Sequence, residues 1–153
     1  MSVARATVVC VELTAADFER IPAGNLRVPR AQFVEVWSSS ERVSDQLEAQ
    51  GRGDWYLIGV AFTCRWLAGA FIVFNYPHGP KRQPASAPIT HTWRAAHEEL
   101  IEREWQATER QLVRHPDGIE GRPGWLEGVS ATLRWVWRGS GVPPVDVGHA
   151  ATG

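Results

Sequence analysis

A run of twenty residues, Trp55 to Phe74, contains one charged side chain, Arg65. A stretch of this length and composition is long enough to cross a bilayer as a helix. Arg65 lies near its middle, however, and placing a charge at the centre of a membrane helix costs about 2.5–3.5 kcal/mol on insertion scales. We therefore interpret the run as a helix buried within protein, and we predict no membrane partner.

Part of this run occurs a second time, 69 residues later. The segment "YLIGVAFTCRWL" (56–67) aligns with "WLEGVSATLRWV" (125–136), and six of the twelve positions are identical. The identical pairs are Leu57/Leu126, Gly59/Gly128, Val60/Val129, Thr63/Thr132, Arg65/Arg134 and Trp66/Trp135. A second block, "WSSSER" (37–42), aligns with "WQATER" (105–110) at an offset of 68 residues. The two colinear blocks indicate a duplicated helical hairpin, spanning about 30–70 and 98–139.

The expected fold is mainly all-α. Two similar hairpins most naturally pair about a pseudo-twofold axis into a four-helix bundle, so we predict a single helical domain over residues 29–139. Apolar spacing and helix-start signals place helices from Pro29 to about 50, from Asp54 through Phe74, from about His91 to Arg114, and from Pro123 to Arg138. A Pro-rich linker (77–90) joins the hairpins. We predict that residues 1–28 form an appendage with a strand within 6–13 and a helix capped by Thr14 and Asp17. Residues 140–153 are predicted to form an extended or mobile tail.

Charge and cysteine content narrow the class of function. The net charge is −1, from 16 basic and 17 acidic residues, which gives no general attraction to nucleic acid, and we predict no nucleic-acid partner. Lys81 is the single lysine beside fifteen arginines, a bias that suggests a GC-rich bacterial genome.

Two further features bear on the cellular location. Cys10 and Cys64 form no CxxC motif, and the N-terminus lacks the basic cluster and the cleavage pattern of a signal peptide. The expected location is the cytoplasm.

Two arginines at matched positions, Arg65 and Arg134, are candidate binding residues. An arginine within an apolar helix must reach solvent or meet a carboxylate. Glu41 and Glu109, which are also matched, are the candidate partners, and the favoured interpretation is two structural ion pairs. The alternative is an anion or small-ligand receptor centred on the two arginines.

The segment "EELIE" supplies three carboxylates, Glu98, Glu99 and Glu102. It resembles the EExxE motif of the MazG-like nucleotide pyrophosphohydrolases, which are all-α enzymes. The resemblance implies Mg²⁺ bound by these three residues, together with a later ExxD motif on another helix. The nearest later segments read "EGRP" from Glu120 and "EGVS" from Glu127, and neither contains the aspartate. A solvated acidic helix face, with Glu99 paired to Arg103, is the favoured alternative.

The chain contains eight tryptophans. Most are expected in the core, but Trp93, Trp125 and Trp137 are candidates for contacts with a partner, because interface hot spots favour Trp, Tyr and Arg. The sequence contains no recognisable set of catalytic residues and predicts no cofactor. We therefore expect a non-enzymatic adaptor or regulatory module that binds another protein or a second copy of itself. The identity of that partner stays open.

Overall fold

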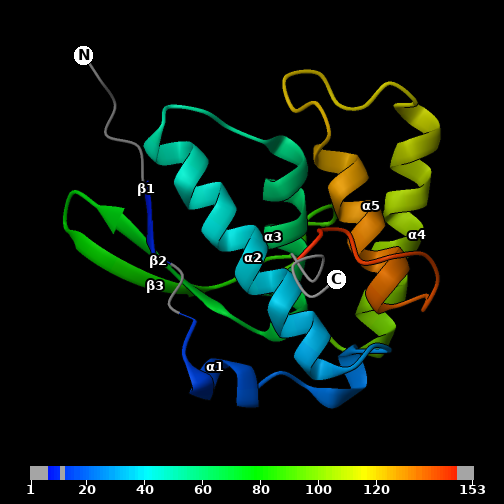
Figure 1. Ribbon diagram of the computed structural model, residues 1–153, viewed down its shortest axis with the longest axis horizontal. Coiled ribbons are helices and arrows are strands. Elements are labelled where there is room, and N and C mark those ends of the chain that lie inside the picture. Colours follow the sequence, from blue (N-terminus) through cyan, green and yellow to red (C-terminus); the bar gives the residue numbers. More distant parts are fainter. Residues whose placement is uncertain (1–6, 11–12, 148–153) are drawn as a thin grey trace, which may run out of the picture.

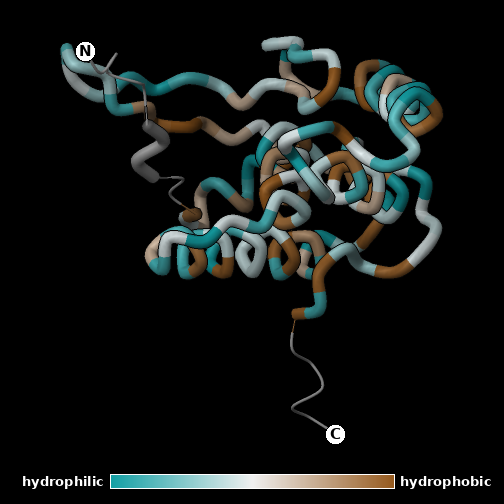
Figure 2. The backbone as a smooth tube through the Cα atoms, turned by 90° about the horizontal axis from the view of Figure 1, so that it is seen from above, coloured by the Kyte–Doolittle hydropathy of each residue, from teal (hydrophilic) through white to brown (hydrophobic). Residues whose placement is uncertain are grey.

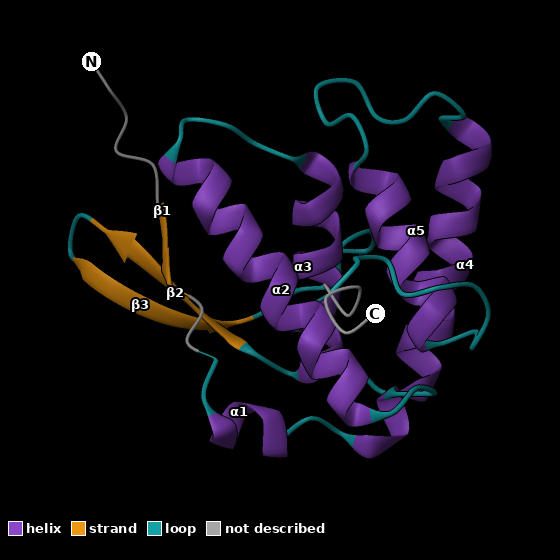
Figure 3. Cartoon of the chain, in the orientation of Figure 1, coloured by secondary structure: helices purple, strands orange, loops and turns teal. Residues whose placement is uncertain are grey.

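The computed structural model describes residues 7–10 and 13–147, which form a mixed fold of helices and a small antiparallel sheet (Figure 3). Along the chain the elements are β1 (Thr7–Cys10), α1 (Ala15–Glu19), the 3₁₀ helix η1 (Ala23–Asn25), α2 (Arg30–Ala49), α3 (Trp55–Ala68), β2 (Phe71–Tyr76), β3 (Gly79–Pro84), α4 (Glu98–Arg114) and α5 (Trp125–Val136). The predicted four-helix bundle is wrong.

The four long helices form a row instead of a closed bundle. Helix α2 packs against α3, α3 against α5, and α5 against α4, so α2 and α4 lie on opposite sides of the central pair (Figure 1). A closed bundle would also need a broad contact between α2 and α4. The described residues of these two helices form none.

The closest helix contact joins α3 and α5 through a reciprocal pair of glycines. A Cβ atom on Gly59 would overlap the carbonyl oxygen of Trp125, and one on Gly128 would overlap the carbonyl oxygen of Tyr56. The hydroxyls of Thr63 and Thr132 each donate, over 2.8 Å, to the carbonyl oxygen of the glycine one turn earlier. The matched sequence of the two helices therefore has a packing reason, because both must present bare backbone at the same crossing point.

Strands β2 and β3 occupy the segment in which the sequence predicts the end of a helix and a linker, whereas β1 lies within the strand predicted at 6–13. Strands β1, β2 and β3 are antiparallel neighbours in that order, and β2 pairs with β3 from Phe71↔Pro84 to Tyr76↔Gly79. Gly69, in the left-handed conformation at φ +68°, ends α3 six residues before the predicted end. The next residues, "FIVFNY", are β-branched and aromatic and so favour a strand. The prolines of β3 are tolerated because β3 is an edge strand.

Other predicted elements agree with the structure or begin later than expected. Helix α2 begins at Arg30 and α5 at Trp125, one and two residues after the prolines predicted to start them. Thr14 and Asp17 form the predicted capping box at α1. The helix predicted from His91 begins instead at Glu98, so that residues 85–97 form a loop between β3 and α4.

The core lies mainly between the helices, and Ile72 of β2 packs into it. Its largest fully buried side chains include Trp37, Trp66 and Phe33, and hydrophobic and hydrophilic positions alternate along the helices (Figure 2). Tyr56 donates its hydroxyl hydrogen to the carbonyl oxygen of Pro144 over 2.8 Å, which ties the C-terminal segment to α3. The rest of the predicted tail, 148–153, lies outside the described residues. Among the described helices, none is both long enough and apolar enough to cross a membrane.

Candidate binding site

The loop from 85 to 97 is held in place by three buried side chains that bond to its backbone. The indole N–H of Trp66 donates to the carbonyl oxygen of Arg94 over 3.0 Å. The amide of Asn25, which is 2% exposed, donates to the carbonyl oxygens of Ala96 and of Leu67. The third side chain is Glu104. Long loops usually carry much conformational freedom, so this number of buried anchors indicates a fixed backbone.

Glu104 of α4 is 1% exposed, and its carboxyl group accepts from two backbone N–H groups of the loop. The distances are 2.6 Å from the nitrogen of Ile89 and 3.1 Å from that of Thr90. A buried carboxyl group is costly unless its oxygens find donors, and here the loop supplies them. Sequence reasoning missed Glu104, although a carboxylate on the buried stripe of α4, beside Leu100 and Ala107, is itself a signal of a specific bonding role.

The loop contains a tight turn that places His91 in an unusual conformation. The N–H of His91 donates to the carbonyl oxygen of Ala87 over 3.1 Å, and the N–H of Ala87 donates to that of Thr92 over 3.0 Å. His91 has φ +61°, and within the described part of the chain no other non-glycine residue has a positive φ. Such a conformation costs roughly 1–3 kcal/mol and persists where its surroundings determine it, as the anchored loop does here.

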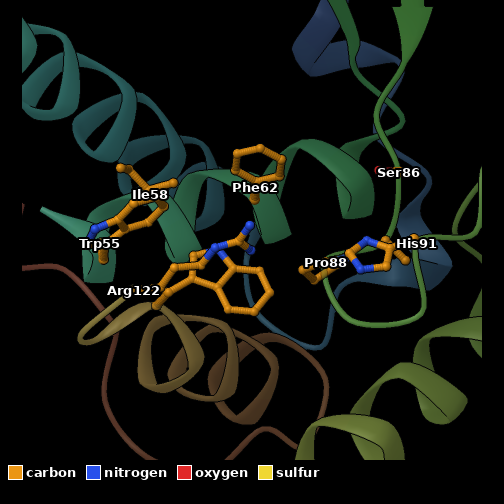
Figure 4. A pocket seen from close by; sticks show the side chains of 9 residues that line it. Trp55, Ile58, Phe62, Ser86, Pro88, His91 and Arg122 are labelled. Carbon is orange, nitrogen blue, oxygen red and sulfur yellow. The ribbon is translucent and has the colours of Figure 1, made fainter. Parts of the chain in front are cut away.

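A cavity of about 240 Å³ lies between this loop and the start of α3 and α5. Its lining is formed by Trp55, Ile58 and Phe62 of α3, by Arg122 and Trp125 at the start of α5, and by Ser86, Ala87, Pro88 and His91 of the loop. Figure 4 shows the loop residues on one side of the cavity and the side chains of α3 on the other. None of the nine lining residues is acidic, and most are aromatic or aliphatic.

Arg122 stacks on two of the aromatic rings that line the cavity. Its guanidinium carbon lies 5.7 Å from the ring centre of Trp55 and 5.5 Å from that of Trp125. The side chain is exposed, and it forms no ion pair with any described carboxylate. No described carboxylate therefore occupies the N–H donors of Arg122.

The arginines chosen from the sequence have different roles. Arg65 pairs with Glu41 through two bonds, of 2.8 Å and 2.6 Å, and the carboxylate of Glu41 also accepts from the indole N–H of Trp37. Both partners are largely buried, so the guanidinium of Arg65 is occupied by the carboxylate of Glu41. Arg65 does not line the cavity. Arg134 and Glu109 are exposed, and the structure places no ion pair between these two described residues.

The three tryptophans chosen as contact residues are also separated. Trp93 lies in the anchored loop and is 58% exposed, whereas Trp125 is buried in the cavity wall. The indole N–H of Trp137 donates to the carboxylate of Glu102 over 2.6 Å, and the guanidinium of Arg27 stacks over its ring. Of the three, Trp93 is the one that a partner can reach.

Two of the three carboxylates of "EELIE" bond to neighbours within the protein. Glu99 pairs with Arg103 over 2.9 Å, which is the acidic-face alternative, and Glu102 accepts from Trp137. Glu98 lies at the first position of α4. Across residues 7–10 and 13–147, no three His, Cys, Asp or Glu side chains are grouped so that they could hold a metal ion. The carboxylate from a second helix that the resemblance requires is therefore not found there.

Cys64 is fully buried in α3 as a free thiol. Burial raises the pKa of this thiol far above its usual range, and the carboxylate of Glu41 raises it further. A thiol that stays protonated is a poor nucleophile, so Cys64 is a packing residue.

The anchoring role of Glu104 can be tested by Glu104→Leu. Leucine has a similar size but no acceptor, so the backbone N–H groups of Ile89 and Thr90, which both bond to Oε2 of Glu104, lose their partner. Losing such a bond costs about 1–3 kcal/mol, and hydrogen exchange at Ile89 and Thr90 should accelerate roughly ten- to hundredfold. Exchange is read by NMR or mass spectrometry. Glu99→Leu, on the exposed face of the same helix, is the control and should change neither amide. Unchanged exchange in Glu104→Leu would exclude the anchoring role.

Comparison with known proteins gives no relative for this chain: no protein-family model, curated protein or solved structure matches it. The anchored loop with Trp93 and the cavity with Arg122 are therefore the features from which a function can be inferred.

Proposed function

We propose that the chain is a non-enzymatic interaction module that binds another protein through the anchored loop, with Trp93 as the main contact. The single observation that carries the proposal is a largely exposed tryptophan on a loop whose backbone is fixed by buried side chains. The Arg-rich composition supports a bacterial source, and a cytoplasmic location is part of the proposal.

The exposure of Trp93 supports a contact role. Tryptophan has one of the largest apolar surfaces of any side chain, and its burial at an interface contributes more than that of most residues. Trp93 makes no hydrogen bond through its indole N–H within the described chain, so the donor is free for a partner. The flanking residue Arg94 is also exposed and adds a second residue type that is common at hot spots.

The fixed backbone of the loop supports the same role. Ordering a loop on binding costs free energy, and a loop that is already ordered avoids this cost. Glu104, Trp66 and Asn25 hold the backbone on both sides of Trp93. The indole is therefore presented on a prearranged support.

The test is Trp93→Ala in an affinity pull-down of the tagged protein from its native cytosol, read by mass spectrometry. We expect a stoichiometric partner whose affinity falls at least about 30-fold in the variant, in line with a hot spot of about 2 kcal/mol. Val113→Ala, which removes an 81% exposed side chain from α4, is the matched control and should retain the partner. A partner that both variants retain would exclude the loop as the contact.

In a second form of this proposal, the partner is another copy of the same chain, and the anchored loop mediates a homodimer. Sedimentation of the purified protein distinguishes the two forms. A dimer that Trp93→Ala converts to a monomer indicates self-recognition, and a monomer in both cases directs the search to a different protein. A protein that remains monomeric and yields no cytosolic partner would rule out the interaction role.

A further inference from the structure

The cavity between α3, α5 and the anchored loop has the size and lining of a small-ligand site. Its volume is about 240 Å³. An engineered cavity of about 150 Å³ in another protein is known to hold one benzene molecule, so this one accommodates a single ring with a short substituent. Trp55, Phe62 and Trp125 supply aromatic surfaces for such a ring. Ligand sites typically combine a lining of this kind with a few placed polar groups.

The polar groups at this cavity favour an anion. Arg122 is a permanent cation without a carboxylate partner among the described residues, and its guanidinium lies within cation–π distance of two indoles. Two N–H donors of a guanidinium match the two oxygens of a carboxylate, and a cation–π contact does not use up these donors. The imidazole of His91, held by the loop, provides a further donor among the lining residues.

We propose that this cavity binds a small carboxylate with an apolar, single-ring body. The carboxylate bonds to Arg122, and the ring lies among Trp55, Phe62 and Trp125. A phosphate group suits the site less well, because its greater charge calls for more cations than one arginine beside a histidine. Trp93 does not line the cavity, so this proposal stands apart from the proposed protein interaction.

The test uses benzoate as the probe and benzyl alcohol as its uncharged counterpart. Binding is followed through the indole N–H resonances in two-dimensional NMR, with the Trp55 signal assigned from Trp55→Phe. We expect benzoate to shift the signals of Trp55 and Trp125 saturably, with a dissociation constant on the order of 0.1–1 mM for a ligand of this size. Benzyl alcohol should bind at least tenfold more weakly, and inorganic phosphate should leave both signals unchanged.

Variants then assign the carboxylate contact. Arg122→Gln should weaken benzoate binding at least tenfold and leave benzyl alcohol binding unchanged within twofold. Arg110→Gln, at an exposed position on α4, is the matched control and should bind benzoate as the parent protein does. Trp93→Ala should also bind benzoate normally, so that failure of this proposal is distinguishable from failure of the protein interaction.

Three results would overturn the proposal. The first is the absence of a saturable shift at Trp55 and Trp125 up to about 10 mM benzoate, a concentration at which sub-millimolar sites are nearly full. The second is equal binding of benzoate and benzyl alcohol by the parent protein, a comparison that needs no variant. The third is a phosphate titration that reproduces the benzoate shifts, which would show that the apolar body contributes nothing.

Discussion

Gly128→Ala is expected to destabilise the protein by about 3 kcal/mol, because overpacking at a backbone contact costs about 1–3 kcal/mol and the neighbour here cannot rotate away. The added methyl would overlap the carbonyl oxygen of Tyr56, which belongs to the backbone of α3. The two central helices must therefore move apart, and their separation would loosen the core around Val60 and Val129. The small gain in helix propensity, about 1 kcal/mol, does not offset this loss.

Thermal or urea denaturation measures the effect, and for a chain of this size about 3 kcal/mol corresponds to roughly 6–12 °C in the midpoint. Gly59→Ala should cost a similar amount, since its Cβ would overlap the carbonyl oxygen of Trp125. The double variant should cost less than the sum, because a single separation of the helices relieves both overlaps. Gly53→Ala is the control: nothing lies within 4 Å of the position its Cβ would take, and its midpoint should not fall. An unchanged midpoint in Gly128→Ala would contradict the close backbone contact between α3 and α5.

The repeated sequence predicts the two central helices well, but it does not determine how the remaining chain is arranged. Gly59 and Gly128 indicate a close backbone approach on each helix, and the structure brings the two into one contact. Composition alone could not show that the apolar run changes from helix to strand after Ala68. Ile, Val and Phe occur on both sides of that point, and the local signals are Gly69 and the β-branched and aromatic residues that follow it. The prediction continues the helix through this glycine and therefore misses the hairpin of β2 and β3.

The candidate site was harder to predict, because its residues come from segments that are far apart in the sequence. Trp55, His91 and Arg122 carry no common motif, and only the fold places them around one cavity. The residue type of Trp93 predicts a contact role, which stays a proposal, but the sequence pattern places it on a helix and the structure places it on a loop. Glu104 was missed because a long-range bond to backbone N–H groups has no spacing that a sequence pattern can show.

The matched arginines show that residues at equivalent positions of the two similar helices can have different structural roles. Arg65 and Arg134 occupy equivalent helix positions, yet Arg65 lies against Glu41 while Arg134 is exposed. The difference arises from the neighbouring helices. Helix α2 covers the side of α3 that carries Arg65, and the carboxylate at the corresponding point of α4, Glu109, faces solvent. Identical residues in two helices therefore predict identical local packing only where both helices face the same contact.

This difference leads to the second large prediction. Glu41→Leu should destabilise the protein by about 3–5 kcal/mol, because it leaves the guanidinium of Arg65 buried without a partner. The variant also removes the acceptor for the indole N–H of Trp37, which is itself 0% exposed. Glu109→Leu is the matched control at the equivalent exposed position and should change stability by no more than about 0.5 kcal/mol.

The double variant Glu41→Leu/Arg65→Met separates a broken ion pair from a loss of packing. Replacing both charges with apolar groups of similar volume removes the uncompensated charge, so the double variant should recover most of the stability that Glu41→Leu loses. Urea denaturation of the parent, the two single variants and the double variant gives the coupling between the two side chains. A double variant as unstable as Glu41→Leu would show that packing around Trp37, and not the unpaired arginine, dominates the cost. A small effect in Glu41→Leu would mean that Arg65 can reach solvent, and the buried pair would then contribute little to the contact between α2 and α3.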